Sequence, residues 1–480
     1  MSTWKEFLEL RAENLSPPAR EEQKQAALGP PGPSFDSPLN TRIQRAMNSH
    51  ASRNLLAQLF LYLAILCSSF DIFLVIEVGM TIRATYILLV PTVLIALSLV
   101  ITRRRVVIPL GLGLLLAWTA FVILFVPRSG LHLRGIAYAA LLVYFVAALS
   151  AIVQVIRSVN QLSRLVRFYL LSFALVGLFG IVQFLLPLVG LPGILVQQWW
   201  INDSLPRSNG FSFEPSYFAT YLLPGWVLMA FLLQTQSRLI QRRWQLYLLF
   251  TIVTIAMVVS SSRMGLAMMG VYFVYFPVKV FWGAVRGRAY SRPIAYSAVG
   301  IAGVAALLIL IFATGTEKLF LEGTGFAGTT SHSTEIRLND LEDTLSVFAQ
   351  SPLLGYSLGG VAPAIASYRG NSADTLSEVQ RHEGMSIFAE VLAASGIIGF
   401  LPFLAYMLLL AIAPLRLAAS VFDREQRLIL IGLTVAFIFQ LVLLQLNQNV
   451  LRPYFWIHIA ILSAAYSVAR ANLNRRVAAT

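Results

Sequence analysis

The chain has 480 residues, of which 57% are apolar and only 12% are charged. Soluble globular domains carry about 25% charged residues, so this composition excludes an ordinary soluble protein. Apolar runs of about 20 residues recur along nearly the whole chain, and each is long enough to cross a hydrocarbon core of about 30 Å. A β-barrel would instead show short segments of alternating polarity. We therefore expect an all-α polytopic membrane protein.

The net charge of +14 does not indicate a nucleic-acid partner. Most of the 36 Lys and Arg residues lie in short loops between apolar runs, where positive charge marks the cytoplasmic side of a membrane. A consistent pattern results when both termini are placed in the cytoplasm. The partner that the composition indicates is the lipid bilayer.

Taken in order, residues 1–52 mix charges with Pro and Gly and are expected to form a partly disordered cytoplasmic tail. The first nine spans fall in residues 53–313. A large periplasmic loop follows at 314–384, the last three spans occupy 385–469, and 470–480 form a cytoplasmic tail. The expected spans, about 12 in all, are 55–76, 84–102, 106–126, 135–156, 168–190, 217–234, 245–260, 264–282, 294–313, 396–415, 428–446 and 454–469.

One long apolar run has to be divided at Ser260–Arg263 to give this pattern. A single merged helix would invert every later loop and would move the arginines of those loops to the outer side. We therefore predict a turn at these residues, on the outer face.

The outer loop is too long to lack structure, so we expect helices within it. Its first helix has Leu338, Leu341, Leu345 and Phe348 at helical spacing, which predicts one apolar face. A second helix is predicted from the capping pattern of Thr375 and Glu378, continuing through His382 into Ile387, Phe388 and Leu392. Both helices are expected to be amphipathic and to lie over the outer mouth of the membrane domain.

The informative charges are the few on the outer side, because positive charge there does nothing for topology and is costly near the membrane. Arg207 precedes a span, with Gly210 and Pro215 shaping the turn, and it either pairs with Glu214 or binds an anion. Arg263 follows three serines and opens a helix, so it either reaches to the interface or also binds an anion. Converging arginines would suit a diphosphate, because guanidinium binds phosphate oxygens in a fork.

His382 is the best candidate for proton transfer, because an imidazole can take up a proton near neutral pH. A structural role is the alternative for a single histidine. The charged neighbours Arg381 and Glu383 favour the functional interpretation.

Several common catalytic motifs are absent from the sequence. It contains no P-loop, no HExxH, no CxxC, no GxSxG and no DxD-like carboxylate pair. We therefore expect neither a nucleotide nor a metal cofactor.

Four segments resemble the superfamily of bacterial O-antigen polymerases and O-antigen ligases. "RSNGFSFEPSYFATYL" resembles its R-x-x-G-x-x-x-x-P turn and helix, and "SSSRMGLAM" resembles its SRG helix start, with Met264 where a small residue is usual. "AQSPLLGYSLGG", after Arg337, resembles the start of its large outer loop. "RHEGMSIFAEVLAASGIIGF" resembles its closing segment, with Glu383 where asparagine is common. The resemblance covers about residues 60–465.

The resemblance implies an enzyme at the outer face of the bacterial inner membrane, with a GT-C-like glycosyltransferase architecture. Such proteins move a glycan from undecaprenyl diphosphate to an acceptor glycan or glycolipid, without a required metal or other cofactor. A chain-length regulator is a further partner that the resemblance leaves open. It implies Arg207 and Arg263 as catalytic cations and His382 as the base. The substrate-binding candidates are Glu214, Arg83, Arg337, Arg381 and Glu383.

Two alternatives accompany this interpretation. Polymerisation of O-antigen or exopolysaccharide repeat units is preferred from the "EPSY" form of the first motif, and ligation of the glycan to lipid A core is the alternative. A transporter or flippase is the competing class, because about 12 spans and cytoplasmic termini suit it as well. Against a transporter, the polar residues gather at the outer face instead of the membrane midplane.

Overall fold

The structure, a computed structural model, describes residues 38–77, 81–103, 106–201, 205–285, 332–371, 376–379, 382–447 and 450–478. By its internal contacts the chain divides into two units, Met1–Arg53 and Asn54–Thr480, and apart from the helical residues up to Arg53 the features below belong to the second.

Helices make up most of the described residues, and two short hairpins supply the strands. The hairpins are β1 (Val75–Glu77) with β2 (Thr81–Arg83), and β3 (Gln198–Ile201) with β4 (Leu205–Arg207), both antiparallel. The helices are α3 (Pro38–Leu66), α4 (Ala84–Arg103), α5 (Leu112–Leu124), α6 (His132–Val155), α7 (Val159–Leu188), α8 (Pro215–Gln234), α9 (Arg243–Ser260), α10 (Arg263–Val285), α13 (His332–Gln350), α14 (Val361–Tyr368), α15 (Leu376–Val379), α16 (Ile387–Ser420), α17 (Arg424–Leu443) and α18 (Pro453–Val477).

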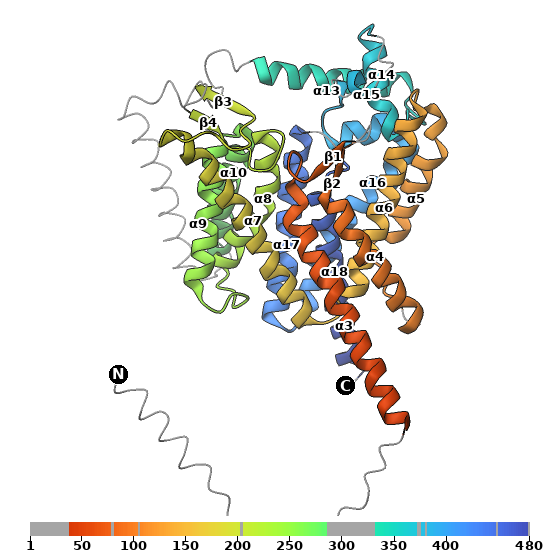
Figure 1. Cartoon of the computed structure of the whole chain (residues 1–480), viewed down its shortest axis with the longest axis vertical. Helices are drawn as coiled ribbons and strands as arrows, with labels where there is room; N and C mark the ends of the chain where they lie inside the picture. Colours follow the sequence, from red (N-terminus) through yellow and green to blue (C-terminus); the bar gives the residue numbers. More distant parts are fainter. Residues whose placement is uncertain are drawn as a thin grey trace, which may run out of the picture. The chain divides into compact units, whose positions relative to one another are not determined.

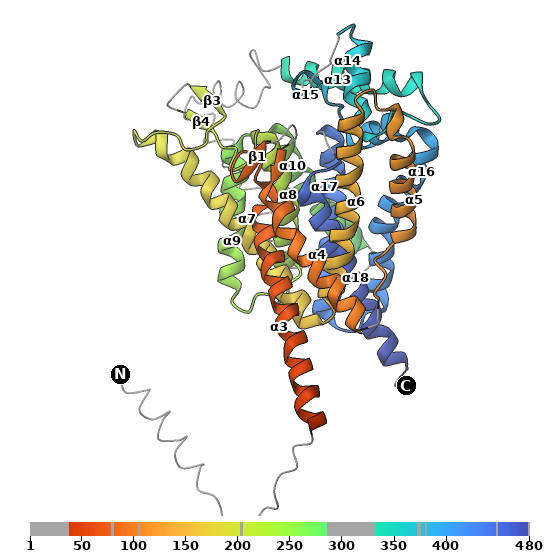
Figure 2. The same cartoon turned by 45° about the vertical axis from the view of Figure 1, so that its right-hand side comes forward.

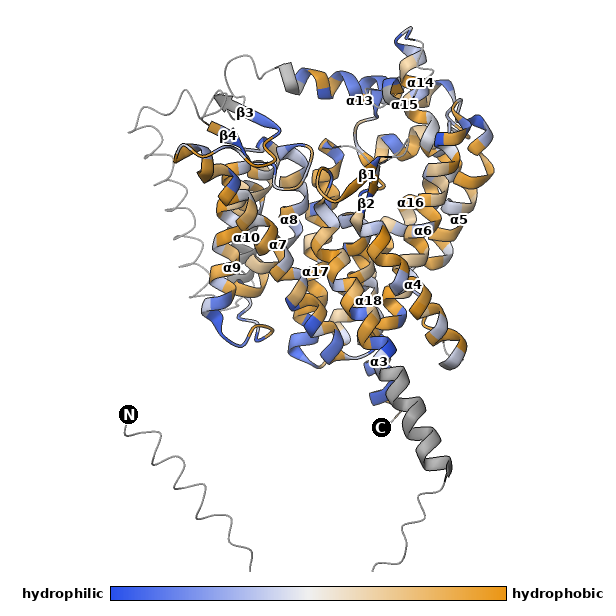
Figure 3. Ribbon diagram, viewed as in Figure 1, coloured by the Kyte–Doolittle hydropathy of each residue, from blue (hydrophilic) through white to orange (hydrophobic). Residues whose placement is uncertain are grey.

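Seven of the described helices are long and apolar enough to cross a membrane, namely α4, α6, α7, α8, α9, α16 and α17. Figure 3 shows apolar residues along the long helices and polar residues gathered at both ends. The expectation of an all-α, multi-pass membrane protein is therefore confirmed. The number of spans and the GT-C-like architecture stay predictions, and the predicted span 294–313 lies outside the described residues.

The long helices run alongside one another, and the connecting elements gather at their ends (Figures 1 and 2). Both hairpins and α13, α14 and α15 lie at one end, which we call the hairpin end, whereas the last turn of α18 lies at the other. The predicted division at Ser260–Arg263 is confirmed: α9 ends at Ser260, Ser261 adopts the left-handed conformation with φ 52°, and α10 begins at Arg263. This turn hydrogen-bonds to the end of β4, through Ser208 N and Val259 O, 3.2 Å apart.

The prediction for the first span was wrong in its second half. The helix α3 ends at Leu66, ten residues earlier than expected, and the chain then turns into the β1–β2 hairpin. The physical reason is Asp71, whose carboxylate is held by arginines and could not lie against lipid.

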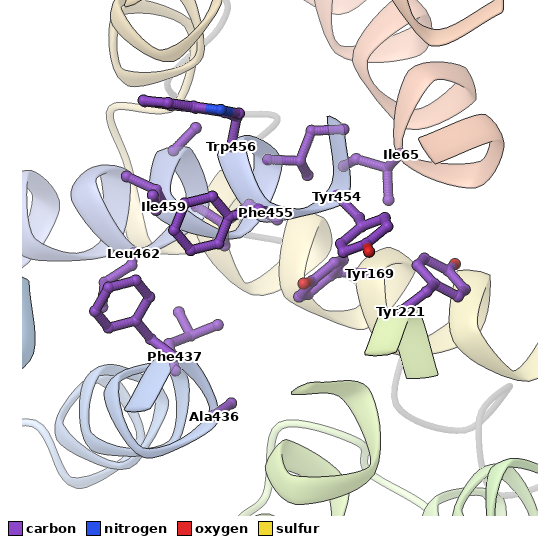
Figure 4. Packing of buried hydrophobic residues seen from close by; sticks show 14 of the residues in the cluster. Ile65, Tyr169, Tyr221, Ala436, Phe437, Tyr454, Phe455, Trp456, Ile459 and Leu462 are labelled. Atoms are coloured by element: carbon purple, nitrogen blue, oxygen red, sulfur yellow. The ribbon is translucent and has the colours of Figure 1, made fainter. Parts of the chain in front are cut away.

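The core lies around α8, which packs against α7, α9, α10 and α17. Close approach is possible because Gly225 of α8 lies against the ring of Phe173: an added Cβ would stand 2.2 Å from a ring carbon. Figure 4 shows the aromatic layer beside it, where Tyr221 of α8 lies close to Tyr454 of α18, with ring centroids 6.0 Å apart. The first turns of α8 and α18 are therefore fixed against each other.

The helix α16 is broken at Gly396, which has φ 56° and ψ −171°. The loop before α14 docks into the break through backbone hydrogen bonds, including Ser357 N to Ala394 O at 2.7 Å and Ile397 N to Pro352 O at 2.8 Å. A Cβ on Gly396 would lie 2.2 Å from the carbonyl carbon of Leu353. Two of the four sequence motifs thus form one backbone-to-backbone joint.

The first predicted helix of the loop is present as α13, and the structure shows which of its faces is buried. In α13, Leu338 and Leu345 are exposed, and the buried face instead carries Thr344 and Val347. Apolar residues at helical spacing do not show which side of a helix faces the protein. In α13 the side that faces the protein also carries polar groups that form contacts, such as Thr344 with Met385 N. The second helix is not continuous through His382, because α15 ends at Val379 and α16 starts after the cap Ser386. Thr375 lies outside the described residues.

Candidate active site

Most polar side chains of the segment "RSNGFSFEPSY" form hydrogen bonds that hold the turn between β4 and α8. Gln183 of α7 lies at its centre, and its Oε1 accepts hydrogen bonds from Asn209 N and Gly210 N, each 2.9 Å long. Ser208 Oγ donates to Gly180 O at 2.7 Å, and Asn209 Nδ2 donates to Ser212 O at 2.7 Å. These groups are buried, so the turn is rigid, and it fixes the residue that precedes it, Arg207.

Gly210 is required by this turn for two reasons. Its φ of +55° is costly for residues with a side chain, and an added Cβ would stand 2.7 Å from the ring of Phe218 in α8. The turn therefore lies directly on the first helical turn of α8.

Arg207 is the last residue of β4, and its contacts are to neutral groups. Its Nη1 donates to Gln198 Oε1 at 3.0 Å, and its Nη2 reaches the carbonyl of Ser261 at 3.4 Å. Its Nε is buried and has no hydrogen-bond partner among the described residues. The side chain therefore points toward the turn that precedes α10, and its Nε–H is left able to donate a hydrogen bond.

Two further arginines lie near Arg207. Arg263 is the first residue of α10, and Arg337 of α13 donates to the carbonyl of Leu446 at 3.1 Å while touching the sulfur of Met264. The pKa of Arg207 is lowered, first by burial and then by the positive charges of Arg263 and Arg337. The structure therefore brings together three of the predicted residues, which we call the arginine cluster: Arg207, Arg263 and Arg337.

Glu214 stands beside the cluster but does not neutralise it. It occupies the N-cap position of α8 without a side-chain hydrogen bond to the helix backbone, and its carboxylate accepts a hydrogen bond from Ser216 Oγ at 2.8 Å. Its charge offsets only part of the repulsion at Arg207. Within the described chain, neither Arg207 nor Arg337 forms an ion pair with a carboxylate, so the Arg207–Glu214 ion pair, one of the two alternatives for Arg207, is not formed.

His382 lies in a second polar group, formed with α13 and the end of α14. Its Nδ1 is 3.4 Å from Nη1 of Arg369. Arg369 in turn binds Asp340 at 2.7 Å and Asp343 at 2.5 Å, both on α13. The same helix therefore carries Arg337 to the arginine cluster and holds the partner of His382.

Glu383 does not contact the imidazole next to it in the chain. Its carboxylate forms an ion pair with Arg134 of α6 at 2.5 Å and accepts a hydrogen bond from Tyr138 Oη at 3.3 Å. Arg134 is buried, with 4% of its side chain exposed. Glu383 therefore anchors the end of the outer loop to α6.

Arg83 belongs to a buried network of its own. It binds Asp71 at 2.7 Å, and Asp71 also binds Arg452 at 2.9 Å, which stacks on the ring of Tyr217 at 3.9 Å. The prediction missed Asp71 and Arg452 as partners of Arg83. A carboxylate inside an apolar run was the signal that could have indicated them.

Two remaining predictions concern Arg381 and metals. Arg381 lies outside the described residues. In the part of the chain that the structure describes, no group of three or more His, Cys, Asp and Glu side chains is arranged to hold a metal ion.

A comparison with protein families finds a match for part of the chain that carries these residues. Residues 246–404, which include Arg263, Arg337 and His382, match the family model described as O-antigen ligase. We call residues 246–404 the family domain because of their similarity to this family. The resemblance to the O-antigen polymerase and ligase superfamily is confirmed. A search of curated proteins finds no match to the chain.

The family domain extends from α9 to the first part of α16. It contains the turn at Ser260–Arg263, all of α13 and α14, and the joint at Gly396. Arg207 and Glu214 precede it in the chain, but the hydrogen bond between β4 and the Ser261 turn brings them to its edge. The family supports a function of the O-antigen ligase or polymerase type.

Proposed function

We propose that this protein is a glycosyltransferase that moves a glycan from undecaprenyl diphosphate to an acceptor sugar. The reaction takes place at the periplasmic face of the bacterial inner membrane, at the hairpin end of the helices. The family domain and the multi-pass helical fold support this proposal.

The observation that carries the proposal is the arginine cluster. Three like charges lie together, and the pKa of Arg207 is lowered by burial and by its neighbours. Such a site is costly without an anion, and a diphosphate would relieve the repulsion. Within the described chain, four other arginines, Arg83, Arg134, Arg369 and Arg452, are each ion-paired with a carboxylate, whereas Arg207 and Arg337 are not.

In the proposed reaction, the oxygen of the acceptor hydroxyl attacks the anomeric carbon of the donor glycan. A carbon–oxygen bond forms, the bond from that carbon to the diphosphate oxygen breaks, and its electron pair leaves with the diphosphate. The arginine cluster stabilises the negative charge that develops on the leaving group. The proton of the hydroxyl goes to His382, acting as the general base. No cofactor is required by these steps.

Polymerisation of repeat units is the activity that we propose first, from the "EPSY" residues beside the cluster. Glu214 is the N-cap residue of α8 in this segment and stands next to the cluster, which supports a role for it in contacting an acceptor sugar. Ligation to lipid A core is the second candidate, and the description of the matched family favours it.

Deletion of the gene, with gel analysis of surface and lipid-linked glycans, separates these possibilities. Single repeats on the acceptor would indicate a lost polymerase, and long lipid-linked chains with none attached would indicate a lost ligase. Complementation by Arg207→Ala or His382→Ala, at normal protein level, is expected to fail. Unchanged glycans after deletion would exclude both activities and would favour another class, such as a transporter.

A further inference from the structure

We propose that Arg369 is a positioning residue that keeps Nδ1 of His382 unprotonated and makes it the atom that receives the acceptor proton. The inference rests on the proposed function, because it assigns the base atom within that reaction. It concerns a residue to which neither the sequence motifs nor the family comparison gives a role.

The orientation of Arg369 is fixed from two sides. Its Nε donates to Asp343 at 2.6 Å, and its Nη2 donates to Asp340 at 2.7 Å. Both aspartates lie on α13, three residues apart, so they are neighbours on the helix surface. A guanidinium held at two edges presents its remaining nitrogen, Nη1, in one direction, and that nitrogen is 3.4 Å from Nδ1 of His382.

A guanidinium can only donate hydrogen bonds. The ring nitrogen that faces Arg369 must therefore be the acceptor, so Nδ1 is unprotonated and the neutral ring carries its proton on Nε2. The lone pair that a general base needs is consequently on Nδ1. We infer that the acceptor hydroxyl donates to Nδ1, in place of the long contact to Arg369.

The same group of residues stabilises the product of proton transfer. When the hydroxyl proton moves to Nδ1, the imidazole becomes a cation while the new glycosidic bond forms. Asp340 and Asp343 carry two negative charges beside it, against the single positive charge of Arg369. The two carboxylates therefore offset the positive charge of Arg369 next to the new cation.

The position of the base relative to the arginine cluster follows from α13. Arg337 and Asp340 are three residues apart on this helix, a rise of about 4.5 Å along its axis. The backbone next to His382 is held to the same helix, because Met385 N donates to Thr344 Oγ1 at 3.1 Å. One rigid helix thus sets the spacing between the leaving-group site and the base.

The test is nitrogen NMR of the full-length protein in lipid nanodiscs, with ¹⁵N-labelled histidine rings. The chain has five histidines, and the signals lost in His382→Gln identify His382. We expect wild type to show an unprotonated Nδ1 and a protonated Nε2, and Arg369→Met to show a mixture of the two forms. A protonated Nδ1 in wild type, or the same form in both proteins, would overturn the inference.

Transfer kinetics separate this inference from the proposed function. Arg369→Met and Asp343→Asn are expected to lower kcat about tenfold or more, since general-base catalysis contributes about 100-fold or more, with little change in KM for the donor. Glu342→Gln is the matched control, an exposed acidic residue of α13 next to Asp343, and it should leave kcat unchanged. If His382→Gln transfers at the wild-type rate, the proposed function fails whatever the NMR result. If only Arg369→Met transfers normally, the inference alone fails.

Discussion

Glu383 and Arg134 form an ion pair of 2.5 Å that joins the end of the outer loop to the first turns of α6. Glu383 immediately follows His382 in the chain. Gly359 of the same loop packs on Gly135, where a Cβ added to Gly359 would lie 2.6 Å from the Gly135 Cα. The loop that carries the proposed base is therefore fastened to the membrane domain at two adjacent points.

Replacing Glu383 with Leu should destabilise the protein by about 3 kcal/mol, because Arg134 would be left buried without a countercharge. The double variant E383L/R134M should recover part of the loss, since no orphan charge remains. Thermal unfolding in detergent measures both. A double variant less stable than E383L alone would contradict this account.

Asp71→Asn should cost about 3 kcal/mol at pH 7, because two arginines share this single buried carboxylate. Burial would raise the pKa of Asp71, but Arg452 and Arg83 outweigh burial and hold it below its usual value. The ion pairs therefore stabilise the fold at all pH values above about 4, and this contribution is lost as pH falls through the lowered pKa.

The difference in unfolding temperature between wild type and Asp71→Asn should accordingly shrink in acid. A series of melts from pH 7 to pH 3 tests the sign. A difference that stays constant over this range would show that the ionised carboxylate is not what stabilises the network.

Gly396→Ala should destabilise the joint between α16 and the outer loop by about 3 kcal/mol or prevent folding. A methyl group there would meet backbone atoms of Leu353, and the positive φ is costly for alanine. Gly270→Ala is the matched control, since it lies inside α10 with open space around it, and it should be neutral or slightly stabilising. Equal effects of the two variants would argue against the joint.

The sequence predicted the helices because hydropathy and positive charge act locally and leave a readable pattern. The turn at Ser260–Arg263 follows from loop charges alone, and the structure confirms it. The prediction of the first span failed because Asp71 forms an ion pair with Arg452, a residue far away in the chain. The carboxylate in the apolar run indicates that Asp71 needs a partner, but no local pattern shows which residue supplies it.

The sequence predicted many of the residues of the candidate site, but not which of them contact each other. Arg207, Arg263 and Arg337 come together because a hairpin, a helix start and an outer-loop helix meet at one place. The partners of Glu383 and His382 could not be predicted, since Arg134 and Arg369 are identified only by the packing of α6 and α14. The sequence also does not show which face of α13 packs on the protein, where Thr344 and Val347 are buried and Leu338 and Leu345 are exposed.

Arg337→Gln should abolish or strongly reduce glycan transfer while leaving the unfolding temperature near that of wild type. The loss of a hydrogen bond to Leu446 costs about 1 kcal/mol, and relief of repulsion at Arg207 offsets it. Loss of activity without loss of stability is expected of a charge that binds a ligand. Replacing Glu383 or Asp71 should instead lower the stability. A large loss of stability with normal transfer would show that Arg337 is structural.

The most direct test of the central claim is equilibrium binding of farnesyl diphosphate, a soluble diphosphate lipid, to the purified protein. Arg207→Gln and Arg337→Gln should each weaken binding about tenfold or more, as expected for a lost hydrogen bond to a charged group. Arg128→Gln is the matched control, because Arg128 donates to Ser351 and lies outside the arginine cluster, so its Kd should equal that of wild type. If all four proteins bind the diphosphate with the same Kd, the arginine cluster is not the diphosphate site.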